Sequence, residues 1–143
     1  MNIFEIRNRL KISGLRITPQ RMAVLSTLIE SDKHPDADQI IRIVRAQYPN
    51  IAVGTIYHIL DNLVQKGIIN KVQTEQNVVR YDAIIEPHIH LYSREENRIE
   101  DYFDEELIEL IENHIVKSKI KGFEIKNIKL QLVGVFRDKK NNY

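Results

Sequence analysis

The chain has 143 residues, 43% of them hydrophobic and 29% charged, and a formal net charge of +1. These values are typical of a globular protein with a buried core and exclude collagenous or strongly disordered chains. The absence of cysteine excludes disulfides and thiolate metal sites, so any metal must be held by His, Asp, Glu or water.

No apolar run is long enough to cross a bilayer, and the first ten residues do not resemble a signal peptide. We therefore expect a cytoplasmic protein with no membrane partner. Charge is divided unevenly along the chain: residues 1–83 carry 11 Lys/Arg against 8 Asp/Glu, a net +3. A negatively charged partner would therefore meet the first part of the chain.

The first half of the sequence predicts four short helices from apolar spacing and capping residues. Thr18 followed by Pro19 is typical of a helix start, and Gly67 is typical of the residue just past a helix end. The expected helices cover residues 2–11, Pro19 through Ile29, the segment after Pro35 to about Gln47, and roughly Val53 to Lys66.

A hairpin is predicted next, from two β-rich runs, Ile68–Gln73 and Val78–Asp82, joined by the polar turn at residues 74–76. Short helices followed by a two-stranded hairpin are typical of a winged helix-turn-helix domain. In that domain the last helix before the hairpin enters the DNA major groove. The alternative is another small α+β domain.

The pattern changes after Asp82, where residues 83–87 are expected to form a hinge. A β-β-α-β unit is then predicted, with strands over His88–Ser93 and Arg98–Phe103, an acidic-fronted helix over Asp104–Ile120, and a strand around Ile128–Leu132 with one buried face. Such a small unit leaves its apolar face and sheet edges uncovered, so we expect a homodimer. The predicted fold class is α+β, with a winged-helix domain at residues 1–83 and a dimerisation domain at residues 84–143.

Two histidines separated by one residue, His88 and His90, lie in the first strand of this second unit. Alternate residues of a strand share a face, so both imidazoles can approach one cation. Chain reversal brings Asp101 of the next strand toward them. The alternative is two polar residues on the solvated face of an edge strand. Together with His34 and Asp82, these donors suit iron(II), manganese or zinc, but spacing alone does not place His34.

Four short motifs resemble, in order and spacing, the signatures of the ferric uptake regulator superfamily. They are Gly14–Arg21 (GLRITPQR), the His-Pro-x-Ala-Asp-x-Ile pattern of residues 34–40, Val53–Tyr57 (VGTIY), and His88-x-His90. The resemblance covers nearly the whole chain. It implies a winged-helix domain and a dimerisation domain joined by a hinge, with a regulatory metal that bridges them.

The family's ligand pattern carries over onto His34, Asp82, His88, His90 and Asp101. The resemblance implies iron(II) or manganese(II) as the regulatory ion, with zinc(II) possible in vitro. An ion bound from both domains stabilises only the arrangement that gathers all its ligands, which would couple metal binding to DNA binding.

Asp101 points to one branch of the superfamily. Peroxide-sensing members resemble this chain in having Asp at this position, whereas iron sensors tend to have Glu. The resemblance implies oxidation of His34 or His88, loss of the metal and release from DNA. The alternative is an iron- or manganese-responsive regulator without peroxide chemistry, in which Asp101 only tunes metal affinity.

The chain departs from the family where many members hold a structural zinc with four cysteines. The matching positions here are Ser93, Glu96, Phe136 and Lys139, so a four-cysteine zinc site is excluded. We expect packing by Phe136 and the strand containing Leu130 and Leu132 to replace this zinc.

The helix that begins near Val53 carries Thr55, Tyr57 and His58 on its less apolar side. The resemblance implies that Tyr57 contacts bases of an operator in the major groove of double-stranded DNA and that Arg16 reaches the adjacent minor groove. Arg21 and Arg7 are candidate phosphate contacts, with solvated helix charges as the alternative.

Two other classes of function compete with a metal-dependent repressor. Two histidines and a carboxylate also form the facial triad of non-haem iron oxygenases, but the sequence contains no signal for the substrate pocket that such an enzyme needs. A winged-helix protein that binds DNA constitutively, with idle metal ligands, is the other alternative. We therefore expect a regulator and not an enzyme.

Overall fold

The computed structural model describes residues 3–31, 34–83, 88–125 and 128–138. The chain divides into two compact units, residues 1–85 and 86–143, which are described separately below. Most of the expected hinge, residues 84–87, lies outside the described residues. Within the described ranges, no helix has the length and apolar character needed to span a membrane.

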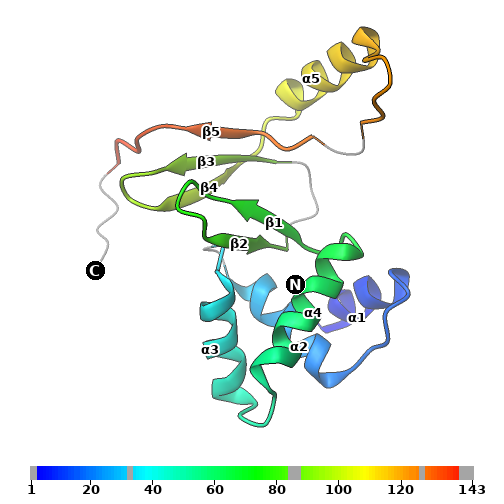
Figure 1. The fold of residues 1–143 in the computed structure, drawn as a ribbon, viewed down its shortest axis with the longest axis vertical. Helices are drawn as coiled ribbons and strands as arrows, with labels where there is room; N and C mark the ends of the chain where they lie inside the picture. Colours follow the sequence, from blue (N-terminus) through cyan, green and yellow to red (C-terminus); the bar gives the residue numbers. More distant parts are fainter. Residues whose placement is uncertain (1–2, 32–33, 84–87, 126–127, 139–143) are drawn as a thin grey trace. The chain divides into compact units, whose positions relative to one another are not determined.

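The first unit contains the four helices and the hairpin that the sequence predicts (Figure 1). Its elements are α1 (Ile3–Ile12), α2 (Pro19–Glu30), α3 (Ala37–Gln47), α4 (Val53–Gln65), β1 (Asn70–Gln73) and β2 (Val79–Asp82). The hairpin strands pair antiparallel, with Asn70 opposite Asp82. This arrangement is a winged helix-turn-helix, so the α+β fold expected for this part of the chain is confirmed.

Capping residues explain where the helices begin and end. The Thr18 hydroxyl accepts a hydrogen bond from the backbone N–H of Arg21 at 3.2 Å and starts α2. Asp36 and Gln39 form a reciprocal capping box at the start of α3. By contrast, Ala52 at the start of α4 provides no side-chain cap. Gly67, at φ +72°, ends the helix in the left-handed region that glycine tolerates.

The core of the first unit is formed by the apolar helix faces that the sequence predicts. Fully or almost fully buried side chains come from all four helices, namely Ile6, Leu10, Val24, Leu25, Leu28, Ile40, Val44, Ile56, Ile59, Leu60 and Leu63. Burial of each such side chain stabilises the fold by about 1.5–3 kcal/mol. Met22, Ile29, Ala37, Ile41 and Val64 are only partly buried and pack against this core.

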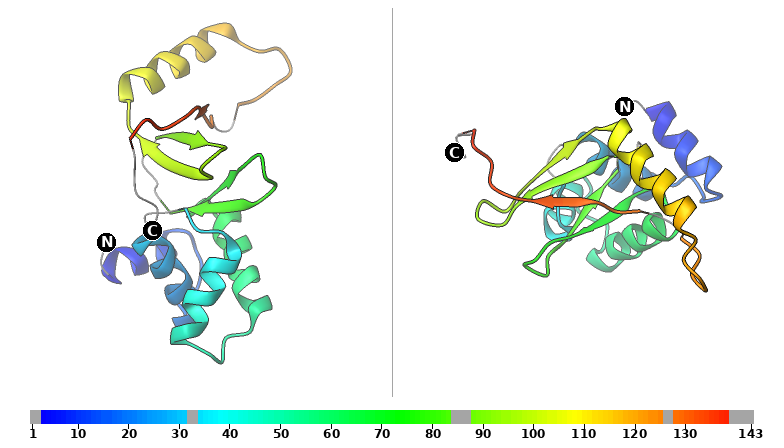
Figure 2. Two further views of the ribbon diagram at one scale, coloured as in Figure 1. Left: turned by 90° about the vertical axis from the view of Figure 1, so that its left-hand side faces the viewer. Right: turned by 90° about the horizontal axis from the view of Figure 1, so that it is seen from above.

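The second unit has the predicted β-β-α-β order (Figure 2). Its elements are β3 (Ile89–Ser93), β4 (Arg98–Tyr102), α5 (Glu105–Ser118) and β5 (Gln131–Val133). The strands form one sheet in the order β4-β3-β5, in which β3 pairs antiparallel with β4 and parallel with β5. The central strand β3 is therefore held on both edges, which fixes His90 within the strand and His88 immediately before it.

The prediction of a last strand with one buried face is wrong for the single chain. β5 is three residues long, Leu132 is 45% exposed and Ile128 is 38% exposed. Helix α5 likewise has no buried residue. The alternation of apolar and polar residues marks an apolar face correctly, but among the described residues of this chain nothing covers that face.

Candidate functional site

Three potential metal donors converge on one face of the second unit. The antiparallel register of β3 and β4 places His90 directly opposite Asp101, and His88 precedes β3 by one residue. The Nε2 atoms of His88 and His90 are 3.0 Å apart. The Oδ1 atom of Asp101 lies 3.5 Å from Nε2 of His88 and 3.6 Å from Nε2 of His90. We call these three residues the ligand cluster.

The geometry of the ligand cluster fits a divalent ion. Donors bound at about 2.1 Å with bond angles near 90–110° lie about 3.0–3.4 Å apart, close to the three observed separations. Two imidazole nitrogens and a carboxylate oxygen are donors that iron(II), manganese(II) and zinc(II) accept. Without an ion, only one of the two facing imidazole nitrogens can donate a hydrogen bond to the other.

A second pair of donors, His34 and Asp82, lies in the first unit. The backbone N–H of Tyr81 donates to the carbonyl of Pro35 at 2.9 Å, and Asp36 forms an isolated antiparallel bridge with Arg80. Continuing that pairing by two residues brings His34 opposite Asp82. Their Nε2 and Oδ2 atoms are 3.9 Å apart, and both side chains are buried.

The geometry of the His34–Asp82 pair suits two ligands of one metal ion. A separation of 3.9 Å is too long for a hydrogen bond but is within the span of about 4.2 Å between two donors on opposite sides of one ion. His34 has φ +49°, a left-handed conformation that non-glycine residues adopt rarely and at a cost of about 1–3 kcal/mol. Such strain is concentrated at functional sites.

One aromatic neighbour of the ligand cluster was not predicted. Phe103 follows β4, and its ring centroid lies 5.6 Å from that of the His88 imidazole, with 41° between the ring planes. None of the sequence motifs includes this residue. A signal was nevertheless available, because the alternation that joins His88 to Asp101 also places Phe103 on the Asp101 side of its strand.

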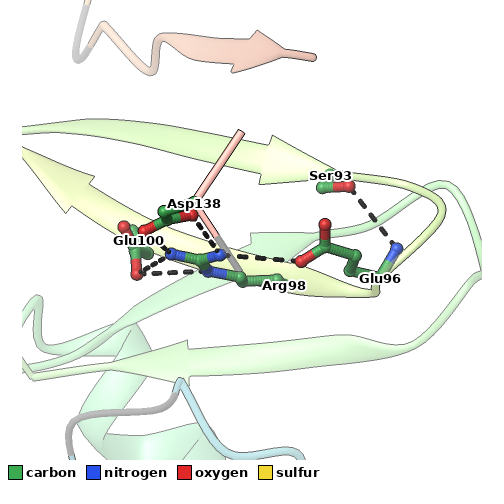
Figure 3. A network of polar contacts seen from close by, with 5 residues as sticks. All are labelled: Ser93, Glu96, Arg98, Glu100 and Asp138. Atoms are coloured by element: carbon green, nitrogen blue, oxygen red, sulfur yellow. Dashed lines mark hydrogen bonds and ion pairs between the residues drawn. The ribbon is translucent and has the colours of Figure 1, made fainter. Parts of the chain in front are cut away.

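At the positions where the sequence excludes a four-cysteine zinc site, this chain has a polar network centred on Arg98 (Figure 3). The Arg98 guanidinium donates to both carboxylate oxygens of Asp138, at 2.9 and 3.1 Å, and to Glu100 at 2.6 Å. It also lies 3.8 Å above the ring centre of Phe136 and 3.6 Å from the Glu96 carboxylate. We call Arg98, Phe136 and Asp138 the arginine clasp.

The packing expected of Phe136 includes a contact with the guanidinium of Arg98. Phe136 is held by a cation–π contact, and the clasp ties the segment after β5 to β4, 40 residues earlier in the chain. Hydrogen bonds to Asp138 and Glu100 raise the pKa of Arg98 above its ordinary value. Of the other positions named for the excluded zinc site, the Ser93 hydroxyl accepts a hydrogen bond from the Glu96 backbone N–H, and Lys139 lies outside the described residues.

The residues expected to contact DNA occupy the exposed side of α4. Thr55, Tyr57 and His58 are exposed, whereas Ile56, Ile59 and Leu60 on the opposite side of the helix are buried. This division leaves a polar helix face that is free to enter a groove.

Basic residues gather near the start of the first unit. Arg7, Lys11 and Arg16 line one surface hollow between α1 and the loop that follows it. Arg21 donates to the Arg16 carbonyl at 2.9 Å, so part of its guanidinium braces that loop. The hollow provides three positive charges for an anionic partner.

Comparison with known proteins identifies the family to which this chain is similar. The profile described as the Ferric uptake regulator family matches residues 12–133. The peroxide operon regulator of Bacillus subtilis (strain 168) is 30% identical over 141 residues, covering 97% of this chain and 95% of that protein.

Two solved structures extend the similarity to the fold. The Campylobacter jejuni peroxide stress regulator has a TM-score of 0.72 at 22% identity and covers 97% of this chain and 99% of its own. The Helicobacter pylori ferric uptake regulator, described as having three functional metal binding sites, has a TM-score of 0.68 at 26% identity, with 92% and 88% covered.

Proposed function

Because the chain belongs to the ferric uptake regulator family of metal-responsive transcriptional regulators, we propose that it is a homodimeric repressor that senses hydrogen peroxide. The observation that carries this proposal is the ligand cluster, whose three donor atoms lie 3.0–3.6 Å apart. Its regulatory ion is iron(II) or manganese(II), and zinc(II) binds in vitro. Members of this family are regulators and not enzymes, so the oxygenase alternative is not carried further.

The proposed ion is bound by His34 and Asp82 from the first unit and by the ligand cluster from the second. The two carboxylates balance the 2+ charge, which lowers the cost of burying the ion. Because the ligands come from both sides of the expected hinge, occupancy favours one arrangement of the two domains. In that arrangement the dimer presents both α4 helices to operator DNA.

Hydrogen peroxide acts on the metal-bound protein by oxidising its histidine ligands. Bound iron(II) supplies the one-electron chemistry that activates hydrogen peroxide, which manganese(II) does not supply under the same conditions. His34 and His88 are the proposed oxidation sites. An oxidised imidazole is a poorer donor, so the chain releases the ion, loses the domain arrangement that it stabilised and leaves the DNA.

The proposed DNA contacts divide into two groups. Thr55, Tyr57 and His58 of α4 contact base edges in the major groove, and Arg16 enters the minor groove. Arg21 and Arg7 contact phosphates, which position the domain but carry no sequence information.

The metal dependence is tested by replacing one ligand. Asp101→Asn removes the negative donor of the ligand cluster while keeping its shape. We expect affinity for manganese(II) to fall by about 100-fold or more, since even indirect ligand partners contribute about 10–100-fold, and operator affinity at limiting metal to fall in parallel. Isothermal titration and gel shifts measure both, with Glu109→Gln on exposed α5 as the matched control. Equal operator binding with and without chelator would instead identify a constitutive DNA-binding protein.

The peroxide step is tested by mass spectrometry of the iron-loaded dimer after a peroxide pulse. We expect one added oxygen atom on peptides containing His34 or His88, loss of operator binding, and protection when manganese(II) replaces iron. Unmodified histidine peptides with retained DNA binding would leave an iron- or manganese-responsive regulator without peroxide chemistry.

A further inference from the structure

The register of β3 and β4 places Phe103 against His88, a proposed metal ligand. The last antiparallel pair of β3 and β4 is Ile89 with Tyr102, and one further pair places Phe103 opposite His88. The two ring centroids are 5.6 Å apart. The Phe103 side chain is 52% exposed, so burial in the core does not account for its position.

Two oxidisable rings, the imidazole of His88 and the phenyl ring of Phe103, therefore lie next to each other. An oxidant that reaches the imidazole of His88 also meets the phenyl ring of Phe103, because the rings are in contact. We propose that Phe103 is a further oxidation site of this protein, hydroxylated on its ring in competition with the ligand histidines. This proposal rests on the proposed function, since it requires iron at the ligand cluster and hydrogen peroxide.

The net reaction balances with peroxide as the sole oxidant. The O–O bond of hydrogen peroxide breaks, one oxygen atom replaces a hydrogen on the phenyl ring as a hydroxyl group, and the other leaves as water with that hydrogen. The ring gives up two electrons and the peroxide takes them. The product at position 103 is a hydroxylated phenylalanine, heavier by one oxygen atom.

Hydroxylation of Phe103 has a different consequence from oxidation of His88. The ring of Phe103 provides no donor atom to the ligand cluster, so its hydroxylation leaves the imidazole and carboxylate donors intact. An equivalent of peroxide used on Phe103 is therefore not used to release DNA. Phe103 raises the amount of peroxide needed to inactivate the repressor.

The site is tested in the full-length, iron-loaded protein with less than one equivalent of peroxide, followed by tandem mass spectrometry. Phe4 and Phe123 are internal controls, because they are 77% and 67% exposed, more than Phe103. Unguided oxidation in solution would modify them at least as much as Phe103. We expect added oxygen on Phe103 and on His34 or His88, and none on Phe4 or Phe123.

A variant tests the competition directly. Phe103→Leu keeps an apolar side chain but removes the ring, and should raise the yield of oxidised His88 per added peroxide by up to about twofold if two adjacent rings share the oxidant. Phe123→Leu should leave this yield unchanged, and circular dichroism verifies that both variants are folded.

The outcomes separate the two proposals. Oxygen on His34 or His88 with unmodified Phe103 overturns the competition and leaves peroxide sensing in place. Equal oxygen on Phe4, Phe103 and Phe123 identifies unguided oxidation and also overturns it. No oxygen on any of these residues overturns peroxide sensing as well.

Discussion

The pKa of the Tyr81 hydroxyl, in β2 of the winged-helix unit, depends on burial and on neighbouring groups. Burial raises the pKa of its hydroxyl above the ordinary value, and the nearby charges of Asp61 and Tyr57 raise it further. The folded state therefore favours the neutral phenol more than the unfolded state does. This preference contributes stability that is present below the unfolded pKa of about 10 and lost as the pH rises through the folded pKa.

Tyr81→Phe should remove this alkaline dependence. We expect the free energy of unfolding of the wild-type protein to fall more steeply between about pH 9 and about pH 11 than that of the variant. Urea titrations across this range measure the difference. Tyr48→Phe, at a 45% exposed position, is the control and should follow the wild type; parallel pH profiles for wild type and Tyr81→Phe would contradict the argument.

At the scale of secondary-structure elements, the start of α4 differs from that of α2. Thr18 caps α2 with its hydroxyl, whereas Ala52 has no group that can cap α4. Ala52→Ser should raise the free energy of unfolding by about 1 kcal/mol, and Thr18→Ala should lower it by a similar amount. Urea denaturation tests both, and a neutral result for both variants would show that water caps these helices equally well.

At the same scale, the arginine clasp joins β4 to the segment that follows β5. Arg98→Lys keeps the charge but loses the planar fork that donates to Asp138 and stacks on Phe136. We expect a lower melting temperature for the variant and a smaller effect of added salt on it than on the wild type. Arg94→Lys, on the exposed turn between β3 and β4, is the control. Identical salt profiles for Arg98→Lys and the wild type would show that the clasp adds no stability.

At the scale of the whole molecule, the uncovered apolar residues of the second unit are the strongest sign of a second copy. Leu132 and Val133 of β5 and Leu110 and Val116 of α5 are between 45% and 73% exposed, and exposed apolar surface of this kind marks interaction sites. Because family regulators are DNA-binding dimers, these surfaces are the expected dimer contact.

Leu132→Glu should shift the protein from dimer to monomer and weaken operator binding, since two half-sites can then no longer be engaged together. Sedimentation velocity and gel shifts measure the two effects. The control is Ile43→Glu on α3, which is 44% exposed in the other unit and should leave the dimer intact. A dimeric Leu132→Glu protein would place the contact on other residues.

The sequence alone was enough to predict the helices and strands of the described residues to within a few residues, because local signals such as Thr18-Pro19 and Gly67 act within one turn of the chain. Motif order also identified the family. By contrast, only the tertiary structure revealed the Arg98–Asp138 pairing across 40 residues, the contact of Phe103 with His88, and the lack of cover over β5. These depend on strand register and on what packs against each face, which local propensity does not encode.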